Sequence, residues 1–248
     1  MNLSLSDSPK QLSLLSIDRI SAIDWPQIQA ELDAQGAAVI PALITARQCA
    51  SLAGLYSDDA QFRSRIVMER HGFGRGEYRY FSYPLPPLIG LLREGLYSGL
   101  HPIANRWYEA LNMPIRFPSQ HSAFIARCHS AGQLRPTPLL LQYGKDDYNC
   151  LHQDLYGEHV FPLQVVVLLS EPGRDFEGGE LVMTEQRPRM QSRAQVIPLR
   201  QGDAAVIAVH HRPVHGSRGA YRVNMKHGVS RLRNGQRHTA GIIFHDAA

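Results

Sequence analysis

The stretch from Tyr143 to Asp154 ends in His152-Gln153-Asp154, which places an imidazole and a carboxylate two positions apart. Side chains at positions i and i+2 of an extended strand point to the same face, so one segment can aim both groups at one point. Two histidines and one carboxylate form a facial triad that binds iron(II) and leaves coordination positions open. The motif therefore predicts two of three metal ligands, and a second histidine from elsewhere would complete the set.

A motif this short is also common in solvated loops, so the surrounding sequence decides between the two interpretations. A β-branched apolar run at 160–169 predicts a buried strand, and Gly178-Gly179-Glu180 predicts a turn that re-enters a strand. Further along, His227 precedes Arg237 by ten positions. The order of these parts favours a metal site over a solvated loop.

Residues 143–245 resemble the iron(II)/2-oxoglutarate-dependent dioxygenases, in the order His-x-Asp, Gly-Gly-Glu-Leu, His, Arg and a final strand. The layout is similar to that of the prolyl hydroxylases and is related to the AlkB-type repair enzymes. A longer match, which includes 71–80 and 184–189, resembles a bacterial family of oxygenases acting on damaged nucleic acid. The resemblance implies a double-stranded β-helix (a cupin-like jelly roll), iron(II), 2-oxoglutarate as cosubstrate, and O2.

The resemblance also implies roles for individual residues. His152, Asp154 and His227 would hold the metal, and Arg237 would grip the far carboxylate of 2-oxoglutarate, because a planar guanidinium pairs with a carboxylate through two hydrogen bonds. His227 is preferred to His215 because the residue ten positions after His215 is Met225, which is no cation. The other competing histidines are His210, His211, His238 and His245. Tyr143 would hydrogen-bond the same carboxylate as Arg237, with Tyr148 as the alternative.

Three functions remain open at this point. The first is oxidative dealkylation of an alkylated nucleic-acid base, with release of succinate and CO2. The second is hydroxylation of a protein or peptide, for instance at proline; the AlkB-type enzymes carry a second arginine six positions after the first, where this chain has Ile243, and this difference favours a prolyl hydroxylase-like pocket. The third is a cupin-like module that binds metal without turnover.

The elements that must position these residues are mainly strands with flanking helices, an α+β class. The regular spacing of many short strands is typical of a sandwich or jelly roll. Strands are expected at 36–41, 121–127, 139–143, 148–154, 160–170, 179–184, 194–199, 203–209, 220–226 and 237–245. Helices are expected within 12–34, from Thr45 to about Tyr56 and within 88–111, the last with an interruption near His101-Pro102. We expect one structural unit, in which helices and supporting strands (1–135) precede a catalytic core (136–248).

Residues 62–87 interleave arginines with aromatic residues around the glycines at 72, 74 and 76. One interpretation is a lid over the site that offers arginines to phosphates and aromatic rings to bases, and the other is an ordinary hairpin. The residues expected to contact substrate are Arg75, Tyr78, Tyr80 and His211.

The charge of the chain is uneven. Residues 187–237 contain eleven Lys or Arg residues and one acidic residue, a net charge of +10, so the remainder carries −6 of the total of +4. This pattern predicts DNA or RNA as a partner, although a general preference for arginine produces it too, and a protein substrate is the alternative.

The three cysteines are scattered and odd in number, which predicts a reducing, cytoplasmic location rather than a disulfide framework. One of them, Cys150, shares the strand parity of His152, so it either lines the pocket or is a small buried filler. No apolar stretch approaches the length of a membrane span, so no membrane partner is expected.

Overall fold

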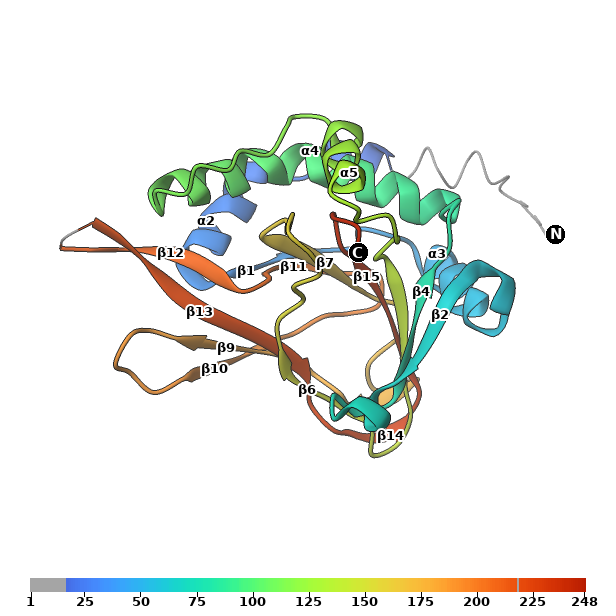
Figure 1. Ribbon diagram of the computed structural model, residues 1–248. Coiled ribbons are helices and arrows are strands. Elements are labelled where there is room, and N and C mark those ends of the chain that lie inside the picture. The colour runs from blue at the N-terminus through green and yellow to red at the C-terminus, as the bar shows by residue number, and fades with distance from the viewer. Residues whose placement is uncertain (1–16, 218) are drawn as a thin grey trace.

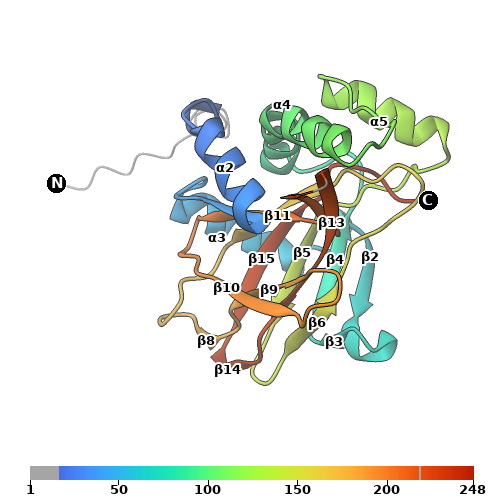
Figure 2. The ribbon, with the colours of Figure 1, turned by 90° about the vertical axis from the view of Figure 1, so that its left-hand side faces the viewer.

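Two large antiparallel sheets face each other, helices lie along one side of them (Figures 1 and 2), and β14 and β8 form a separate two-stranded sheet. The computed structural model describes residues 17–217 and 219–248, so the helix start expected near residue 12 and the charge of Arg218 lie outside the described residues. The larger sheet has the strand order β1-β11-β7-β15-β5-β4-β2, and the smaller sheet has the order β10-β9-β13-β6-β3 with β12 paired to β13. The predicted jelly-roll class is confirmed.

The elements have the following bounds. The helices are α2 (Trp25–Gln35), α3 (Ala46–Gly54), α4 (Pro87–Ala110) and α5 (His121–Ser130), with short 3-10 turns η1 (Leu55–Ser57), η2 (Asp59–Gln61) and η3 (Met68–His71). The strands of the first half are β1 (Ala37–Ile40), β2 (Phe62–Val67), β3 (Gly74–Arg75), β4 (Glu77–Phe81), β5 (Leu139–Tyr143) and β6 (Tyr148–His152). Those of the second half are β7 (Leu163–Leu168), β8 (Phe176–Gly178), β9 (Leu181–Gln186), β10 (Arg193–Ile197), β11 (Ala204–Ala208), β12 (His211–Gly216), β13 (Gly219–Val229), β14 (Leu232–Gly235) and β15 (Arg237–Ile242).

Strand β7 shows how the larger sheet serves two surfaces at once. Val165 and Val167 are fully buried in the apolar core that includes the helices, whereas Gln164 and Val166 point the other way and line a cavity. Because successive side chains of a strand alternate between faces, a strand buried on both faces reads as a nearly continuous apolar run. This explains the β-branched run at 160–169 and its one polar residue, Gln164.

Local signals in the sequence define the helix starts. Asp24 accepts a hydrogen bond from the Gln27 N–H at 3.0 Å, and Thr45, where a helix was expected to start, forms a capping box with Gln48. Helix α4 is continuous through Pro102, contrary to the expected interruption. Within the described residues, no helix combines the length and apolar character that crossing a membrane requires.

The strand expected at 121–127 is wrong, because these residues belong to helix α5. Phe124 and Cys128 are its buried residues, and a spacing of four positions places them on one face of a helix. Phe124 contacts Phe161 and Phe117 with ring centroids 5.9 and 5.4 Å away, so the helix is fixed by packing that no local pattern reveals.

The candidate lid is anchored in the larger sheet at both ends. β2 pairs with β4, and β4 pairs with β5, so most of 62–81 is sheet edge, as the hairpin alternative expected. The segment between them, 68–76, overhangs the cavity: β3 pairs with β6, and Gly72 and Phe73 line the cavity.

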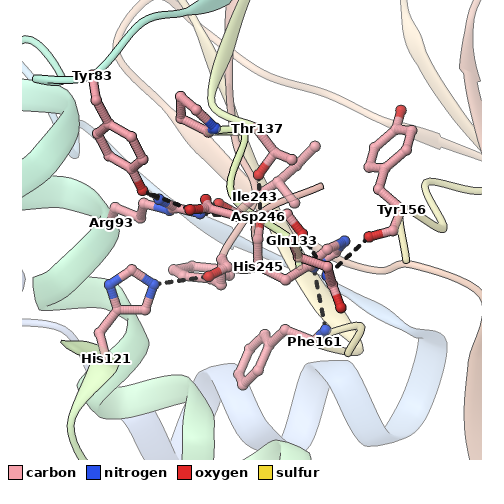
Figure 3. A network of polar contacts seen from close by, with 12 residues as sticks. Tyr83, Arg93, His121, Gln133, Thr137, Tyr156, Phe161, Ile243, His245 and Asp246 are labelled. Carbon is pink, nitrogen blue, oxygen red and sulfur yellow. Dashed lines mark hydrogen bonds and ion pairs between the residues drawn. The ribbon is translucent and has the colours of Figure 1, made fainter. Parts of the chain in front are cut away.

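A buried polar network holds the last residues of the chain against α4 and α5 (Figure 3). The Arg93 guanidinium donates to Asp246 at 2.7 Å and to the carbonyl oxygens of Ile243 and His245 at 2.8 and 3.0 Å. The Tyr83 hydroxyl donates to the second oxygen of Asp246 at 2.8 Å. Arg93 and Asp246 are 2% and 0% exposed, so the charges depend on each other for compensation.

The Asp246→Asn variant should therefore lose about 3 kcal/mol of unfolding free energy, because it leaves the Arg93 cation buried without a counter-ion. Urea denaturation measures this loss. Tyr83→Phe is the matched control, since it removes the hydrogen bond to the same carboxylate and the one that Tyr83 accepts from Arg93 but keeps both charges, and it should cost only about 1–2 kcal/mol. Equal losses in the two variants would show that the charge pair contributes nothing special.

Candidate metal centre and its cavity

A cavity of about 350 Å³ lies between the two sheets. Its walls come from β4, β5, β7 and β15 of the larger sheet and from β6, β9 and β13 of the smaller one, with the loop after β6 and the 68–76 segment at its edge. On β15, the residues that face the cavity are Arg237, Thr239 and Gly241, at alternate positions. The strand period therefore decides which side chains reach the cavity.

The structure brings His152, Asp154 and His227 together at this cavity. His152 ends β6 and lies directly across the ladder from His227 on β13, with ring centroids 4.3 Å apart. The Nε2 atoms of His152 and His227 lie 3.5 and 3.3 Å from the two carboxylate oxygens of Asp154. One ligand atom from each residue lies within 4.8 Å of the others, and across 17–217 and 219–248 no other group of this kind occurs.

These groups fit a divalent metal ion. Ligand atoms bonded at about 2.1 Å and at right angles to one another lie about 3 Å apart, close to the observed spacing. The Nδ1 atom of His152 donates to the Cys150 carbonyl oxygen at 2.8 Å, which leaves Nε2, the atom nearest Asp154, as the one that would bind a metal ion. Two imidazoles and one carboxylate suit iron(II), and other first-row metals bind such a set too.

The three groups also perturb each other's ionisation. Burial disfavours the charged form of Asp154, but hydrogen bonds from His152 and His227 outweigh it and hold the pKa of the carboxyl well below its usual range. Burial lowers the pKa of His227. For His152 burial acts in the same direction but is outweighed by the bond and charge of Asp154, which raise its pKa. The site therefore keeps an ionised carboxylate, as a metal ligand must be.

Arg237 lies in the same cavity and is 2% exposed. It pairs across the ladder with Tyr143, and its guanidinium carbon lies 5.6 Å from the centroid of that ring. Its Nη1 donates to the Thr239 hydroxyl at 2.6 Å, while its Nε is buried without a hydrogen-bond partner. Burial lowers its pKa to about 10, so it remains a cation at neutral pH. A buried cation with an unused donor is suited to an anionic ligand.

The glycine turn behind Arg237 leaves no room for a side chain. Gly179 has φ +63, and a Cβ there would lie 2.5 Å from Leu232 Cδ1 and 3.1 Å from Arg237 Cδ. Gly178 is restricted in the same way, since it has φ +75 and a Cβ there would lie 2.5 Å from the Arg231 carbonyl oxygen, so the predicted turn requires glycine at both positions.

We expect Gly179→Ala to destabilise the protein by about 1–2 kcal/mol through its left-handed backbone and by about 1–3 kcal/mol more through overpacking against Leu232. Gly173→Ala separates the two effects, because Gly173 has φ +80 but nothing within 4 Å of its Cβ position. Chemical denaturation of both variants gives the difference. Equal losses would mean that Leu232 moves aside without cost.

Other residues predicted for the site are placed differently. Tyr143 is fully buried and lines the cavity. Tyr148 does not line it: this residue starts β6 opposite Arg75 and is 38% exposed, which disagrees with a contact to 2-oxoglutarate. Cys150 is exposed and lines the cavity, so the alternative of a buried filler is wrong.

Among the residues expected to contact substrate, only Tyr78 lines the cavity. Tyr80 is 8% exposed and packs against Tyr78, with the two ring centroids 5.4 Å apart. The Arg63 guanidinium lies over the Tyr80 ring, 4.5 Å from its centroid. The Arg75 side chain is half exposed on β3, 4.0 Å from Asp147. His211 is on β12 against His210, with ring centroids 3.9 Å apart, and is also outside the cavity lining.

Several polar residues of the cavity were not predicted, and two of them lie against the metal ligands. Gln164 is 3% exposed with Nε2 3.0 Å from His227 Nε2, and Tyr156 donates to Asp154 Oδ1 at 2.7 Å. A single glutamine within the apolar run at 160–169 was a usable signal for the first. Tyr156 follows Asp154 by two positions but lies outside any strand, so the alternation of side chains along a strand could not predict its contact with Asp154.

The basic character of 187–237 is partly neutralised inside the fold. Glu185, 6% exposed at its side chain, pairs with Arg187, Arg193 and the buried Arg212. Arg237 is buried in the cavity. Among the cations of this segment that the structure describes, the exposed ones are Arg187 and Arg193 in part, and Arg189, Arg200, Arg222, Lys226, Arg231 and Arg233.

Comparison with known proteins places this geometry in a family. A family model described as an oxygenase catalysing oxidative methylation of damaged DNA matches residues 76–247. An uncharacterised protein of Mycobacterium tuberculosis strain H37Rv is 48% identical over 168 residues, which cover 68% of this chain and 72% of that protein. The corresponding protein of strain CDC 1551 matches equally.

Solved structures share the fold at low identity. A prolyl-4-hydroxylase from Pseudomonas putida superposes with a TM-score of 0.55 and 12% identity, over 90% of this chain and 99% of that one. An oxidoreductase of the 2OG-Fe(II) oxygenase family from Burkholderia pseudomallei gives 0.53 and 15%, over 92% and 94% of the two chains. By its sequence the chain therefore belongs to the Oxygenase-NA family, and it shares its fold with these two solved structures.

Proposed function

We propose that the protein is an iron(II)- and 2-oxoglutarate-dependent dioxygenase that hydroxylates a C–H bond of an alkylated nucleic-acid base. The observation that carries the proposal is the convergence of two imidazoles and one carboxylate on the cavity that also holds the buried Arg237. The three metal ligands alone would also be compatible with a protein that binds metal without catalysing a reaction. A buried guanidinium with an unused Nε donor in the same cavity adds the anchor that a dicarboxylate cosubstrate requires.

Each residue has a role in this proposal. His152, Asp154 and His227 hold the metal, and Arg237 and Thr239 bind the far carboxylate of 2-oxoglutarate beside the Tyr143 ring. When bound, iron(II) with 2-oxoglutarate and O2 supplies the oxidising power, with release of succinate and CO2. The apolar walls, including Val166 and Leu141, exclude water from the reacting groups.

The mouth of the cavity supports a planar substrate. Phe73, 47% exposed on the overhanging segment, and Tyr78 both line the cavity and offer aromatic faces. Enzymes that act on a base take it out of the stack and hold it between apolar and aromatic side chains. The exposed arginines of the basic segment would contact phosphates. Hydroxylation of an N-methyl group yields a hydroxymethyl group, which breaks down to formaldehyde and the unmodified base.

The direct test uses purified protein with iron(II), 2-oxoglutarate and oligonucleotides that carry methylated bases, with unmethylated oligonucleotides as controls. We expect formaldehyde and succinate in equal amounts from a methylated substrate only. Succinate without formaldehyde from any oligonucleotide would support the enzyme class and reject the nucleic-acid substrate.

A second candidate is a protein or peptide hydroxylase. It is favoured by Ile243, a cavity residue at the position of the second AlkB-type arginine, and by a fold shared with a prolyl-4-hydroxylase. A +16 Da product on a cellular protein after co-expression would support it. Succinate formation with either substrate, an oligonucleotide or a protein, would exclude the remaining candidate, a cupin-like module that binds metal without turnover.

A further inference from the structure

We propose that Tyr156 is a positioning residue that orients the carboxylate ligand Asp154, and that Gln133 holds Tyr156 in place for this purpose. The Tyr156 hydroxyl donates to Asp154 Oδ1 at 2.7 Å, while Oδ2 of the same carboxylate lies 3.3 Å from His227 Nε2. The hydrogen bond fixes the rotation of the carboxyl group and leaves Oδ2 directed at the metal site. The proposal rests on the metal site of the proposed function.

Tyr156 needs such support because it has no regular structure of its own. Residues 153–162 follow β6 without helix or strand, so no backbone ladder defines where this phenol points. A side chain in an irregular segment is held only by contacts from elsewhere in the fold. The position of Tyr156 is therefore set by whatever clamps this segment.

Gln133 is that clamp (Figure 3). It is 1% exposed, and its amide nitrogen donates to the carbonyl oxygens of Tyr156 and His159, both at 3.1 Å. Its amide oxygen accepts from the His159 N–H at 2.8 Å. Between these contacts lies Gly157, where a Cβ would be 2.6 Å from Gln133 Cδ, so the segment closes directly on the amide.

Further contacts hold the ring of Tyr156 and the other side of Asp154. The Tyr156 ring lies between Tyr80 and His245, with centroids 6.3 and 6.2 Å away. On the preceding side of Asp154, the Gln153 amide donates to the Asn224 side chain at 2.7 Å and to the Met225 carbonyl oxygen at 2.8 Å. The ligand thus sits between two anchored neighbours.

The clamp extends to the end of the chain. Gln133 also donates to the Asp246 carbonyl oxygen, and the Phe161 N–H donates to His245 Nδ1 at 3.2 Å. The network of Arg93 and Asp246 described above holds these residues against α4. The last residues of the chain therefore support the metal ligand through Gln133 and Tyr156.

The test compares Co(II) binding to the full-length wild type and to Tyr156→Phe, by calorimetry and by the visible absorption of the bound ion. Loss of a partner that orients a metal ligand commonly weakens binding by about 10–100-fold. We expect a weakening in this range together with a changed Co(II) spectrum. Tyr56→Phe is the matched control, because it also removes a buried phenol hydroxyl that donates to a carboxylate, Glu77 at 2.9 Å, but neither residue lines the cavity, and it should bind Co(II) as the wild type does.

A second variant, Gln133→Met, removes the clamp and keeps Tyr156. It should weaken Co(II) binding in the same direction, provided that circular dichroism shows a folded protein; if it does not fold, Tyr156→Phe alone decides. A Tyr156→Phe protein with wild-type affinity and spectrum would overturn the proposal, even if its thermal midpoint fell, because a lowered midpoint alone marks a merely structural role. Failure of the wild type to bind Co(II) would overturn the metal site itself, and both proposals with it.

Discussion

The Asp154→Ala variant is expected to bind the metal about 1000-fold more weakly than the wild type and to form no measurable succinate. Asp154 is the only anion among the three ligand groups, and it is 8% exposed. Removing one partner of a buried charged set costs about 3–5 kcal/mol, and each 1.4 kcal/mol is a factor of ten in affinity. Calorimetry with Mn(II) under anaerobic conditions measures the affinity, and succinate release measures turnover.

A suitable control is Asp59→Ala, which removes a carboxylate that is 89% exposed and lies outside the cavity. Its metal affinity should equal that of the wild type. If Asp154→Ala kept its affinity to within about threefold, the ligand assignment would be wrong and the convergence of the three side chains would have another purpose.

Replacing Arg237 by glutamine should raise the KM for 2-oxoglutarate by about 100-fold or more, with metal binding retained. The guanidinium is buried, and truncating one partner of a buried charge-assisted pair costs about 2–5 kcal/mol. Glutamine keeps a hydrogen-bond donor on a shorter side chain, but neither the charge nor the planar fork. The KM from succinate formation, and the affinity of 2-oxoglutarate for the Mn(II)-loaded protein without O2, are the two measurements.

Arg233→Gln provides the comparison, because Arg233 is exposed on the neighbouring strand β14 and does not line the cavity of the metal site. Its KM should be unchanged. An equal rise in both variants would point to a general effect of positive charge, and no rise in Arg237→Gln would remove the anchor from the proposed function.

The sequence was informative where a strand carries the site. His152 reaches the cavity from the end of β6 and Arg237 from β15, and the order of the motifs selected His227 among several histidines. The strand expected over 148–154 ends at His152, so Asp154 is placed by the irregular segment that follows and not by strand parity. Of the two tyrosines named for the 2-oxoglutarate carboxylate, Tyr143 lines the cavity, whereas Tyr148 lies at the start of β6, where it is exposed.

The parts that the sequence did not reveal depend on contacts between distant residues. Helix α5 was taken for a strand because Phe124 packs on Phe161, which is 37 positions away in the printed sequence. The clamp of Gln133 on Tyr156 spans 23 positions and uses backbone groups, which no residue pattern encodes.

Strand β7 separates the helix-covered core from the cavity of the metal site. Val165 and Val167 on one face belong to the apolar core that includes helix residues. Gln164 and Val166 on the other face line the cavity. Protein interiors transmit small displacements rather than absorbing them. Substitutions that weaken the packing of α4 in this core will therefore shift Gln164 relative to His227. On heating, such variants should lose turnover at a lower temperature than the one at which they unfold.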